Sequence, residues 1–437
     1  MQMNWNQLLT CQRLGIENTE GDGVRTEYYR DYDRIVFSAS FRRLARKTQV
    51  HPLSFNDHIH NRLTHSIEVS CVGRSLGLAV AKKIKDRLPN DITEVDFASI
   101  IQAACVAHDI GNPPFGHAGE YAIRQWFKEN DNLLDESLTE GQRKDLMSFE
   151  GNAQGLRIVS QLENHYKNGG LRLTYSTLGA LIKYPWKSDN KLTNEKDKFN
   201  IFQSEIDIFN KIIDATGLLK LDNGSYSRHP LSYLMEAADD ICYKILDVED
   251  ALELNILRMD EIIPIFRKLS NSDDIKDIGN NFAARKRIVN YRAKVIENLI
   301  NQVVDVFEDN YESIMNGQFS GDLIDKIDGD CKQGIDEIKK ITTENIFSNR
   351  RKVELEVGSY SSIEIILNAF ILAVNDKMKN GNEITFKSKR ILDLMQDDLP
   401  SDDCSAYDYY MSITDFVSGM TDNYATFIAK QISGSAK

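Results

Sequence analysis

Prolines and paired cysteines are scarce in this 437-residue sequence. Only eight prolines interrupt the chain, so few positions are barred from the interior of a helix. The six cysteines include no CxxC pair, which argues against a zinc site, a redox motif or a disulfide scaffold. We expect buried free thiols at all of them: Cys11, Cys71, Cys105, Cys242, Cys331 and Cys404.

Long apolar runs are absent as well. No stretch of about eighteen consecutive apolar residues occurs, so the sequence predicts no transmembrane helix. The N-terminal segment MQMNWNQLLTCQRLG lacks the charged, apolar and small-residue parts of a signal peptide. We therefore expect a cytoplasmic protein that does not bind a membrane.

Basic residues are fewer than acidic ones, 53 Lys and Arg against 66 Asp and Glu, so the formal net charge is -13. This balance argues against a protein whose whole surface binds nucleic acid. A local basic pocket could still bind a polyanionic small molecule. Because 41% of the residues are hydrophobic, the chain can also bury a large core.

Apolar residues recur at spacings of three and four along most of the chain, which is typical of amphipathic helices. Three clear cases are the sets Leu63, Ile67, Val72 and Leu76; Phe97, Ile101 and Ala104; and Leu234, Ala238, Ile241 and Ile245. The sequence therefore predicts an all-α fold, with at most a minor β-hairpin around Leu355 to Ile363. We expect a catalytic helical core over residues 1–255 and a C-terminal helical region over 256–437 packed on it.

Two histidines and two aspartates fall on the apolar faces of three predicted helices. His108 shares a face with Phe97, Ile101 and Ala104, and Asp109 follows it, while His65 and Asp239 occupy similar positions elsewhere. A single histidine in such a place is more often a core residue bonded to a backbone carbonyl. A buried aspartate, however, is costly unless it is paired or bound to metal. The set suits one divalent ion, such as Mn, Mg, Co, Fe, Ni or Zn.

The order of these residues, H…HD…D, resembles that of the HD-domain metal phosphohydrolases. Longer stretches are similar in order and wording to the bacterial deoxynucleoside triphosphate (dNTP) triphosphohydrolases, often called dGTPases. These stretches span residues 25 to 425 and are YRDYDRIVFSASFRRLARKTQV, NRLTHSIEV, HDIGNPPFGHAGE, FEGNAQGLRIV, LIKYPW, RHPLSYLMEAADDICY and DFVSGMTDNYA. The resemblance implies hydrolysis of a dNTP at the α-phosphorus, which yields deoxynucleoside and inorganic triphosphate.

The stretch VAHDIGNPPFGHAGE contains a second pair of functional side chains. Pro113 and Pro114 stop one helix, and His117 and Glu120 lie one turn apart at the start of the next. Taken alone, His117 could equally be a helix-start residue with a local hydrogen bond. The resemblance implies that His117 is the catalytic histidine and that Glu120 orients it.

Further residues are expected around the substrate. Arg62, one turn before His65, is the best-placed cation for the phosphates. Tyr243 and Asp247 follow Asp239 at four-residue steps, which places them on one helical face near the deoxyribose. By resemblance alone, the remaining phosphate and sugar contacts are Asn152, Lys183, Tyr184, Lys198 and Gln49.

The sequence leaves several alternatives open. Asn112 stands where many relatives carry histidine, which favours one metal ion over two. The resemblance implies a homo-oligomer, with a hexamer as the first expectation, and a dNTP activator or single-stranded DNA as candidate effectors. The alternative functions are hydrolysis of another nucleotide phosphate ester and a non-catalytic regulator that binds nucleotide or single-stranded DNA.

Overall fold

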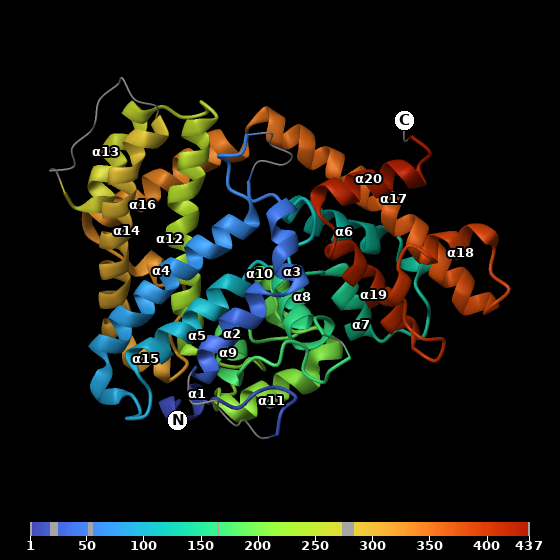
Figure 1. The fold of residues 1–437 in the computed structure, drawn as a ribbon, viewed down its shortest axis with the longest axis horizontal. Helices are drawn as coiled ribbons and strands as arrows, with labels where there is room; N and C mark the ends of the chain where they lie inside the picture. The colour runs from blue at the N-terminus through green and yellow to red at the C-terminus, as the bar shows by residue number, and fades with distance from the viewer. Residues whose placement is uncertain (1, 18–24, 51–55, 165, 273–283, 436–437) are drawn as a thin grey trace.

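A computed structural model describes residues 2–17, 25–50, 56–164, 166–272 and 284–435 (Figure 1). These residues form twenty α-helices and isolated β-bridges, with no β-sheet among them. The all-α prediction is confirmed.

The helices of the first half of the chain, through the long α12, are α1 (Trp5–Leu8), α2 (Glu27–Val36), α3 (Ala39–Arg43), α4 (Arg62–Lys83), α5 (Glu94–Ala107), α6 (His117–Glu129), α7 (Glu140–Met147), α8 (Gly151–Arg157), α9 (Tyr175–Leu181), α10 (Lys191–Lys196), α11 (Ile206–Thr216) and α12 (Pro230–Glu253). Those that follow are α13 (Met259–Ser270), α14 (Ala284–Asp309), α15 (Tyr311–Met315), α16 (Gly329–Ile341), α17 (Arg350–Asn380), α18 (Phe386–Leu392), α19 (Ala406–Ser418) and α20 (Asp422–Ile432).

Helices α4, α5 and α12 form the centre of the molecule and carry the predicted metal ligands. A capping box fixes the start of α4, where Asn61 and Thr64 bond to each other's backbone. Helices α4 and α5 approach closely because Gly77 has no side chain, and a Cβ there would lie 2.7 Å from Ala98 Cα. This contact aligns the first turn of α4 with the last turn of α5.

Two apolar cores flank this centre. The first joins α4, α5 and α12 to α13, α14 and α16, which lie at the left of Figure 1. The second joins α6 and α7 to α17, α19 and α20, at the right of the same view. Each core takes residues from both sides of position 255, and that position lies in the connection between α12 and α13.

The predicted hairpin at Leu355 to Ile363 is wrong, because this segment lies within the 31-residue helix α17. Its β-branched residues and Gly358 resemble a strand when taken in isolation. Over a longer window, buried residues recur at helical spacing at Ile363, Ile366, Leu367, Phe370, Ile371 and Val374. Packing of that stripe on α6, α19 and α20 decides the conformation.

One segment of α17, Lys352–Asn380, is long and apolar enough to cross a membrane when judged by length and composition alone. Its most apolar window has a mean hydropathy of 1.6, and 44% of that window is buried inside the protein. Core helices of globular proteins often have the same composition, so the segment is weak evidence for a membrane span.

The six cysteines are free, as expected, but they are not all buried. Cys105, Cys242 and Cys331 lie in the interior, whereas Cys11 and Cys71 are exposed. Cys71 is on the outer side of α4, because it lies between the buried positions that face α5 and α12.

A buried polar contact joins three distant segments beside the candidate site. Lys47 is only 3% exposed and donates to the carbonyl oxygens of Asn112 and Ser418, each at 2.6 Å. The Asp422 carboxylate accepts hydrogen bonds from the Thr48 and Phe115 backbone amides. The loop before α4, the turn before α6 and the corner between α19 and α20 are thereby held together.

Burial lowers the pKa of Lys47 from 10.5 to about 7. In the unfolded chain the lysine binds a proton up to pH 10.5, whereas in the folded protein it releases that proton above about pH 7. The contribution of Lys47 to the free energy of unfolding therefore rises with pH between about 7 and 10.5. We predict that the stability advantage of the wild type over Lys47→Met grows by up to about 1.4 kcal/mol per pH unit in that interval.

Thermal unfolding from about pH 6 to about pH 9 measures this difference. Lys85→Met is the control, because that lysine is 72% exposed and pairs with Glu94 on the surface. A stability difference between wild type and Lys47→Met that stays constant with pH would contradict the prediction.

Candidate active site

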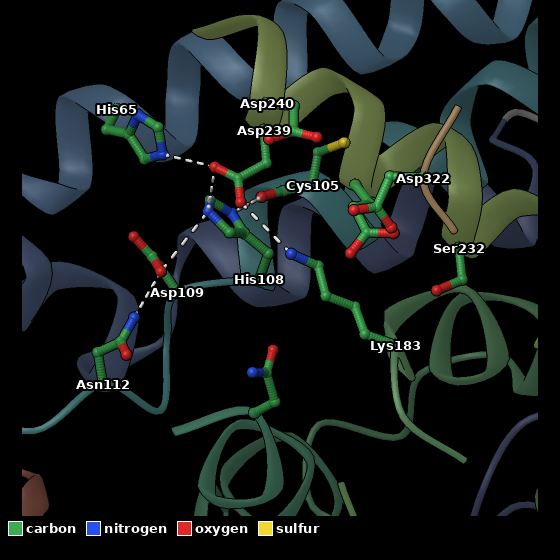
Figure 2. Close-up of polar contacts among 12 residues, drawn as sticks. His65, Cys105, His108, Asp109, Asn112, Lys183, Ser232, Asp239, Asp240 and Asp322 are labelled. Carbon is green, nitrogen blue, oxygen red and sulfur yellow. Dashed lines mark hydrogen bonds and ion pairs between the residues drawn. The ribbon is translucent and has the colours of Figure 1, made fainter. Parts of the chain in front are cut away.

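The four predicted metal ligands meet where α4, α5 and α12 come together (Figure 2). Asp239 Oδ1 lies 3.0 Å from His65 Nε2 and 3.4 Å from His108 Nε2. Asp109 Oδ1 lies 3.6 Å from His108 Nε2. These contacts link the four side chains into one cluster.

Hydrogen bonds fix the orientation of these groups from behind. His108 Nδ1 donates to the Cys105 carbonyl oxygen at 2.7 Å, which turns Nε2 toward the carboxylates. Asn112 donates to Asp109 Oδ1 at 2.5 Å, and Arg62 donates to Asp109 Oδ2 at 2.7 Å. Asn112 thus supports one of the predicted ligands.

Charges inside this group oppose the cost of burial. Burial alone lowers the pKa of His108, but the Asp109 and Asp239 carboxylates outweigh it and raise that pKa. Burial alone raises the pKa of Asp239, but His108 and Lys183 hold it well below the usual range. Both carboxylates are therefore ionised and surrounded by cationic or polar donors.

The residues present fit a divalent metal ion. His65, His108 and Asp109 each offer one ligand atom, and these atoms lie within 4.8 Å of one another. The buried His108 Nε2 has no hydrogen-bond partner among the described residues, although it faces the carboxylates of this cluster. Imidazole nitrogens with carboxylate oxygens are ligands for several divalent transition metals.

The turn before α6 brings Arg62 beside the next functional pair. Phe115 and Gly116 both have positive φ, of 66° and 60°, after the two prolines. A Cβ on residue 116 would lie 2.7 Å from the Arg62 guanidinium, so glycine leaves room for that cation. His117 then begins α6, and its Nδ1 lies 3.1 Å from Glu120 Oε2.

The His117 imidazole is open to solvent, whereas its partner is not. The His117 side chain is 72% exposed and that of Glu120 is 3% exposed. Burial alone raises the pKa of Glu120, but the hydrogen bond from His117 and the charges of Lys198 and Arg124 lower it to about 2. An ionised carboxylate thus supports an accessible imidazole, which suits acid–base chemistry.

Several residues predicted only from the resemblance lie beside this pair. Lys198 Nζ is 2.6 Å from Glu150 Oε1, and that oxygen also accepts a hydrogen bond from Asn152 at 3.0 Å. Lys183 Nζ is 3.4 Å from Asp239 Oδ2, on the far side of the ligand group from His65. Both lysines keep a carboxylate partner, and those charges outweigh burial and raise their pKa values.

One cavity of about 310 Å³ connects these groups. Eleven of the fourteen predicted site residues line it: Gln49, Arg62, His108, Asp109, His117, Asn152, Lys183, Tyr184, Lys198, Asp239 and Tyr243. His65, Glu120 and Asp247 are not in the lining. His65 and Glu120 contact lining residues from behind, at Asp239 and His117 respectively.

Asp247 lies one helical turn beyond Tyr243 and is 2% exposed. Its Oδ2 has no hydrogen-bond partner among the described residues. Burial raises the pKa of Asp247 well above its usual value, and the charges of Asp250 and Asp239 raise it further. This buried carboxyl group therefore has an unused hydrogen-bonding oxygen one helical turn from the lining residue Tyr243.

Three lining residues come from a segment in which sequence reasoning placed no site residue. Phe347 ends a π-helix, and Lys352 and Glu356 belong to the first turns of α17. The Phe347 ring lies 6.2 Å from the Tyr243 ring, and Lys352 pairs with Glu356. No motif marks this segment, which contacts the cavity only through the packing of the second half of the chain.

Comparison with known proteins agrees with this geometry. The HD domain family model matches residues 62–163. The chain is 44% identical to a deoxyguanosinetriphosphate triphosphohydrolase-like protein of Pseudomonas aeruginosa, over 99% of each chain. It is 36% identical to a protein of the same description from Synechocystis, over 99% of each chain. It is 30% identical to the deoxyguanosinetriphosphate triphosphohydrolase of Klebsiella pneumoniae, over 93% of each chain. The chain therefore belongs to the deoxyguanosinetriphosphate triphosphohydrolase family of HD-domain hydrolases.

Proposed function

We propose that this protein hydrolyses dNTPs at the α-phosphorus to deoxynucleoside and inorganic triphosphate. The supporting observation is the shared cavity, which joins a metal-type ligand group, a solvent-accessible His–Glu pair and four cations, Arg62, Lys183, Lys198 and Lys352. The names of the relatives from Pseudomonas and Klebsiella point to the same chemistry. These groups lie far apart in the sequence, and a single substrate in this cavity would contact all of them.

His65, His108, Asp109 and Asp239 would hold one divalent ion, for which Mn, Mg, Co, Fe, Ni and Zn are candidates. When bound, such an ion supplies Lewis-acid chemistry for attack on a phosphate ester. Arg62, whose guanidinium is already held by Asp109, stands at the edge of this group and faces the cavity.

Cations that line the cavity would bind the triphosphate. Arg62, Lys183 and Lys198 reach the cavity from three different segments, so they can neutralise charge along an extended polyanion. Asn152 and Tyr184 add neutral donors between the two lysines. A phosphate chain can displace the carboxylate partners that the lysines keep in its absence.

His117 moves the proton in this mechanism. Its Nδ1 is bonded to Glu120, so Nε2 is the nitrogen available to the reacting atoms. Glu120 fixes the tautomer and stabilises the imidazolium during transfer. Protonation of the leaving 5'-oxygen and activation of the attacking water both require an imidazole at this position.

The sugar and base would lie toward α12 and α17. Tyr243 packs beside the sugar, where a ribose 2'-hydroxyl would collide with its ring. Asp247 accepts the hydrogen bond of the 3'-hydroxyl, and Gln49 is a further deoxyribose contact. Gln49 Oε1 is buried without a partner among the described residues, which suits this role. Phe347 offers a stacking surface, and Glu356 accepts from base N–H groups such as the adjacent pair of guanine.

Product analysis of the purified protein tests the proposal. Each dNTP, and GTP as the ribose control, is incubated with Mn²⁺ or Mg²⁺, and the products are separated by ion-exchange chromatography. Deoxynucleoside with intact triphosphate is expected, and GTP should be a poor substrate. Turnover of mixtures but of no single dNTP would indicate an activating nucleotide. Pyrophosphate or monophosphate as the primary product would refute the proposal.

A further inference from the structure

The buried guanidinium of Arg124 contacts Glu120 of the candidate acid–base pair and Asp197, which precedes the candidate phosphate-binding residue Lys198. Arg124 lies on α6, one turn after Glu120, and its side chain is 4% exposed. Sequence reasoning gave it no role, because an arginine inside an amphipathic helix is normally a solvated residue.

Every nitrogen of this guanidinium has a defined acceptor. Nη2 donates to Glu120 Oε1 at 2.8 Å, and Nε donates to the Phe149 carbonyl oxygen at 2.5 Å. Nη1 donates to Asp197 Oδ2 at 2.5 Å. A planar group that satisfies three separate segments holds them in one geometry, which a lysine ammonium cannot reproduce.

The first consequence concerns His117. Arg124 and the Gly151 amide both bond to Glu120 Oε1, at 2.8 and 3.4 Å, so only Oε2 remains for the imidazole. The exposed His117 ring has no other hydrogen bond among the described residues. Its orientation therefore depends on a carboxylate that Arg124 holds in place.

The second consequence concerns Lys198. Asp197 has a left-handed backbone, with φ of 53°, at the end of α10, and Arg124 anchors its carboxylate. The next residue, Lys198, then extends toward Glu150 and Glu120 along the cavity wall. By anchoring Asp197, the same guanidinium positions the backbone from which the Lys198 side chain extends.

We propose that Arg124 is a positioning residue that aligns the His117–Glu120 pair with Lys198, so that proton transfer and triphosphate binding share one frame. This inference rests on the proposed function. Arg124 does not line the cavity and touches neither substrate nor metal ligands. It acts through Glu120 and Asp197, and together with His117 and Lys198 it lowers the pKa of the buried Glu120.

The test compares pH profiles of kcat for wild type and Arg124→Met. Without the cation, one of the charges that oppose the burial of Glu120 is lost, so the pKa of this carboxyl rises, and its protonation removes the acceptor of His117. We expect kcat to fall by about 10–100-fold at alkaline pH. The loss should grow as the pH falls, so the variant gains an acid limb that the wild type lacks.

Two controls separate positioning from general damage. Arg157→Met removes another buried guanidinium, one that pairs with Glu205 and Asp415 away from His117, and should lower stability without adding an acid limb. In a Glu120→Gln background, Arg124→Met should lower kcat little further, because the two residues act through one contact. If Arg124→Met does not fold, Arg124→Lys carries the same test, with a smaller shift of the acid limb.

The outcomes are distinguishable. A wild-type protein that releases no triphosphate refutes the proposed function, and the inference falls with it. An active wild type whose Arg124 variants retain its kcat and pH profile refutes the inference alone. Additive losses in the Glu120→Gln background would also overturn it, because they would show that Arg124 does not act through Glu120.

Discussion

Asp239→Ala is expected to abolish metal binding and turnover together. Asp239 lies within 3.4 Å of both imidazole nitrogens and also pairs with Lys183. Its removal takes away the carboxylate on which the ligand group converges, and we expect kcat to fall by more than about 100-fold. Metal content by atomic emission and product release by chromatography, measured on the same preparation, test both effects.

The adjacent residue provides a matched control for this substitution. Asp240 lies on the same helix turn, pairs with Lys244 at 3.0 Å and does not line the cavity. Asp240→Ala should therefore keep metal and turnover. Because Asp239→Ala leaves Lys183 buried without its carboxylate, Asp239→Asn is the safer second variant. Stoichiometric metal and normal turnover in either Asp239 variant would disprove the ligand assignment.

His117→Ala is expected to separate binding from chemistry. Loss of a general acid or base lowers kcat by about 10²–10⁴-fold. The side chain is 72% exposed and bonds only to Glu120 among the described residues, so the fold should lose no more than about 0.5 kcal/mol of stability. Calorimetric titration with dGTP should show an affinity close to that of the wild type.

Substitution of another exposed histidine controls for surface effects. His58 is exposed, and no described contact joins it to His117 or Glu120, so His58→Ala should preserve kcat. If His117→Ala hydrolyses dGTP at the wild-type rate, this residue does not transfer the proton. If it loses dGTP binding and turnover equally, its role lies in substrate affinity and the mechanism proposed above is wrong.

Helical periodicity in the sequence predicted well which side chains face the interior. His108 and Asp239 had to face inward because their neighbours at three- and four-residue steps are apolar, and both lie on the predicted interior face. The same reasoning placed Tyr243 toward the cavity. It did not show that Asp247 is absent from the cavity lining, since a helical face specifies direction but not depth.

Contacts between distant segments lay beyond this reasoning. Glu356 belongs to a stretch that resembled a hairpin over nine residues, and only the longer apolar stripe of α17 shows that it is helical. The sequence did not single out Arg124, because its acceptors include Phe149 and Asp197, which no local pattern connects to α6. The hydrogen bond from Lys47 to the Ser418 carbonyl oxygen likewise depends on packing between the N-terminal and C-terminal parts of the chain.

The order of segments around the cavity has a consequence during synthesis on the ribosome. All four proposed metal ligands have been translated once α12 is complete, yet Phe347 and Glu356 follow about a hundred residues later. Asp422, which holds the Thr48 and Phe115 amides, comes later still. The ligand group can therefore be translated long before the remaining cavity walls exist. Under the proposed function, unfinished chains should not hydrolyse dNTPs, the precursors of DNA.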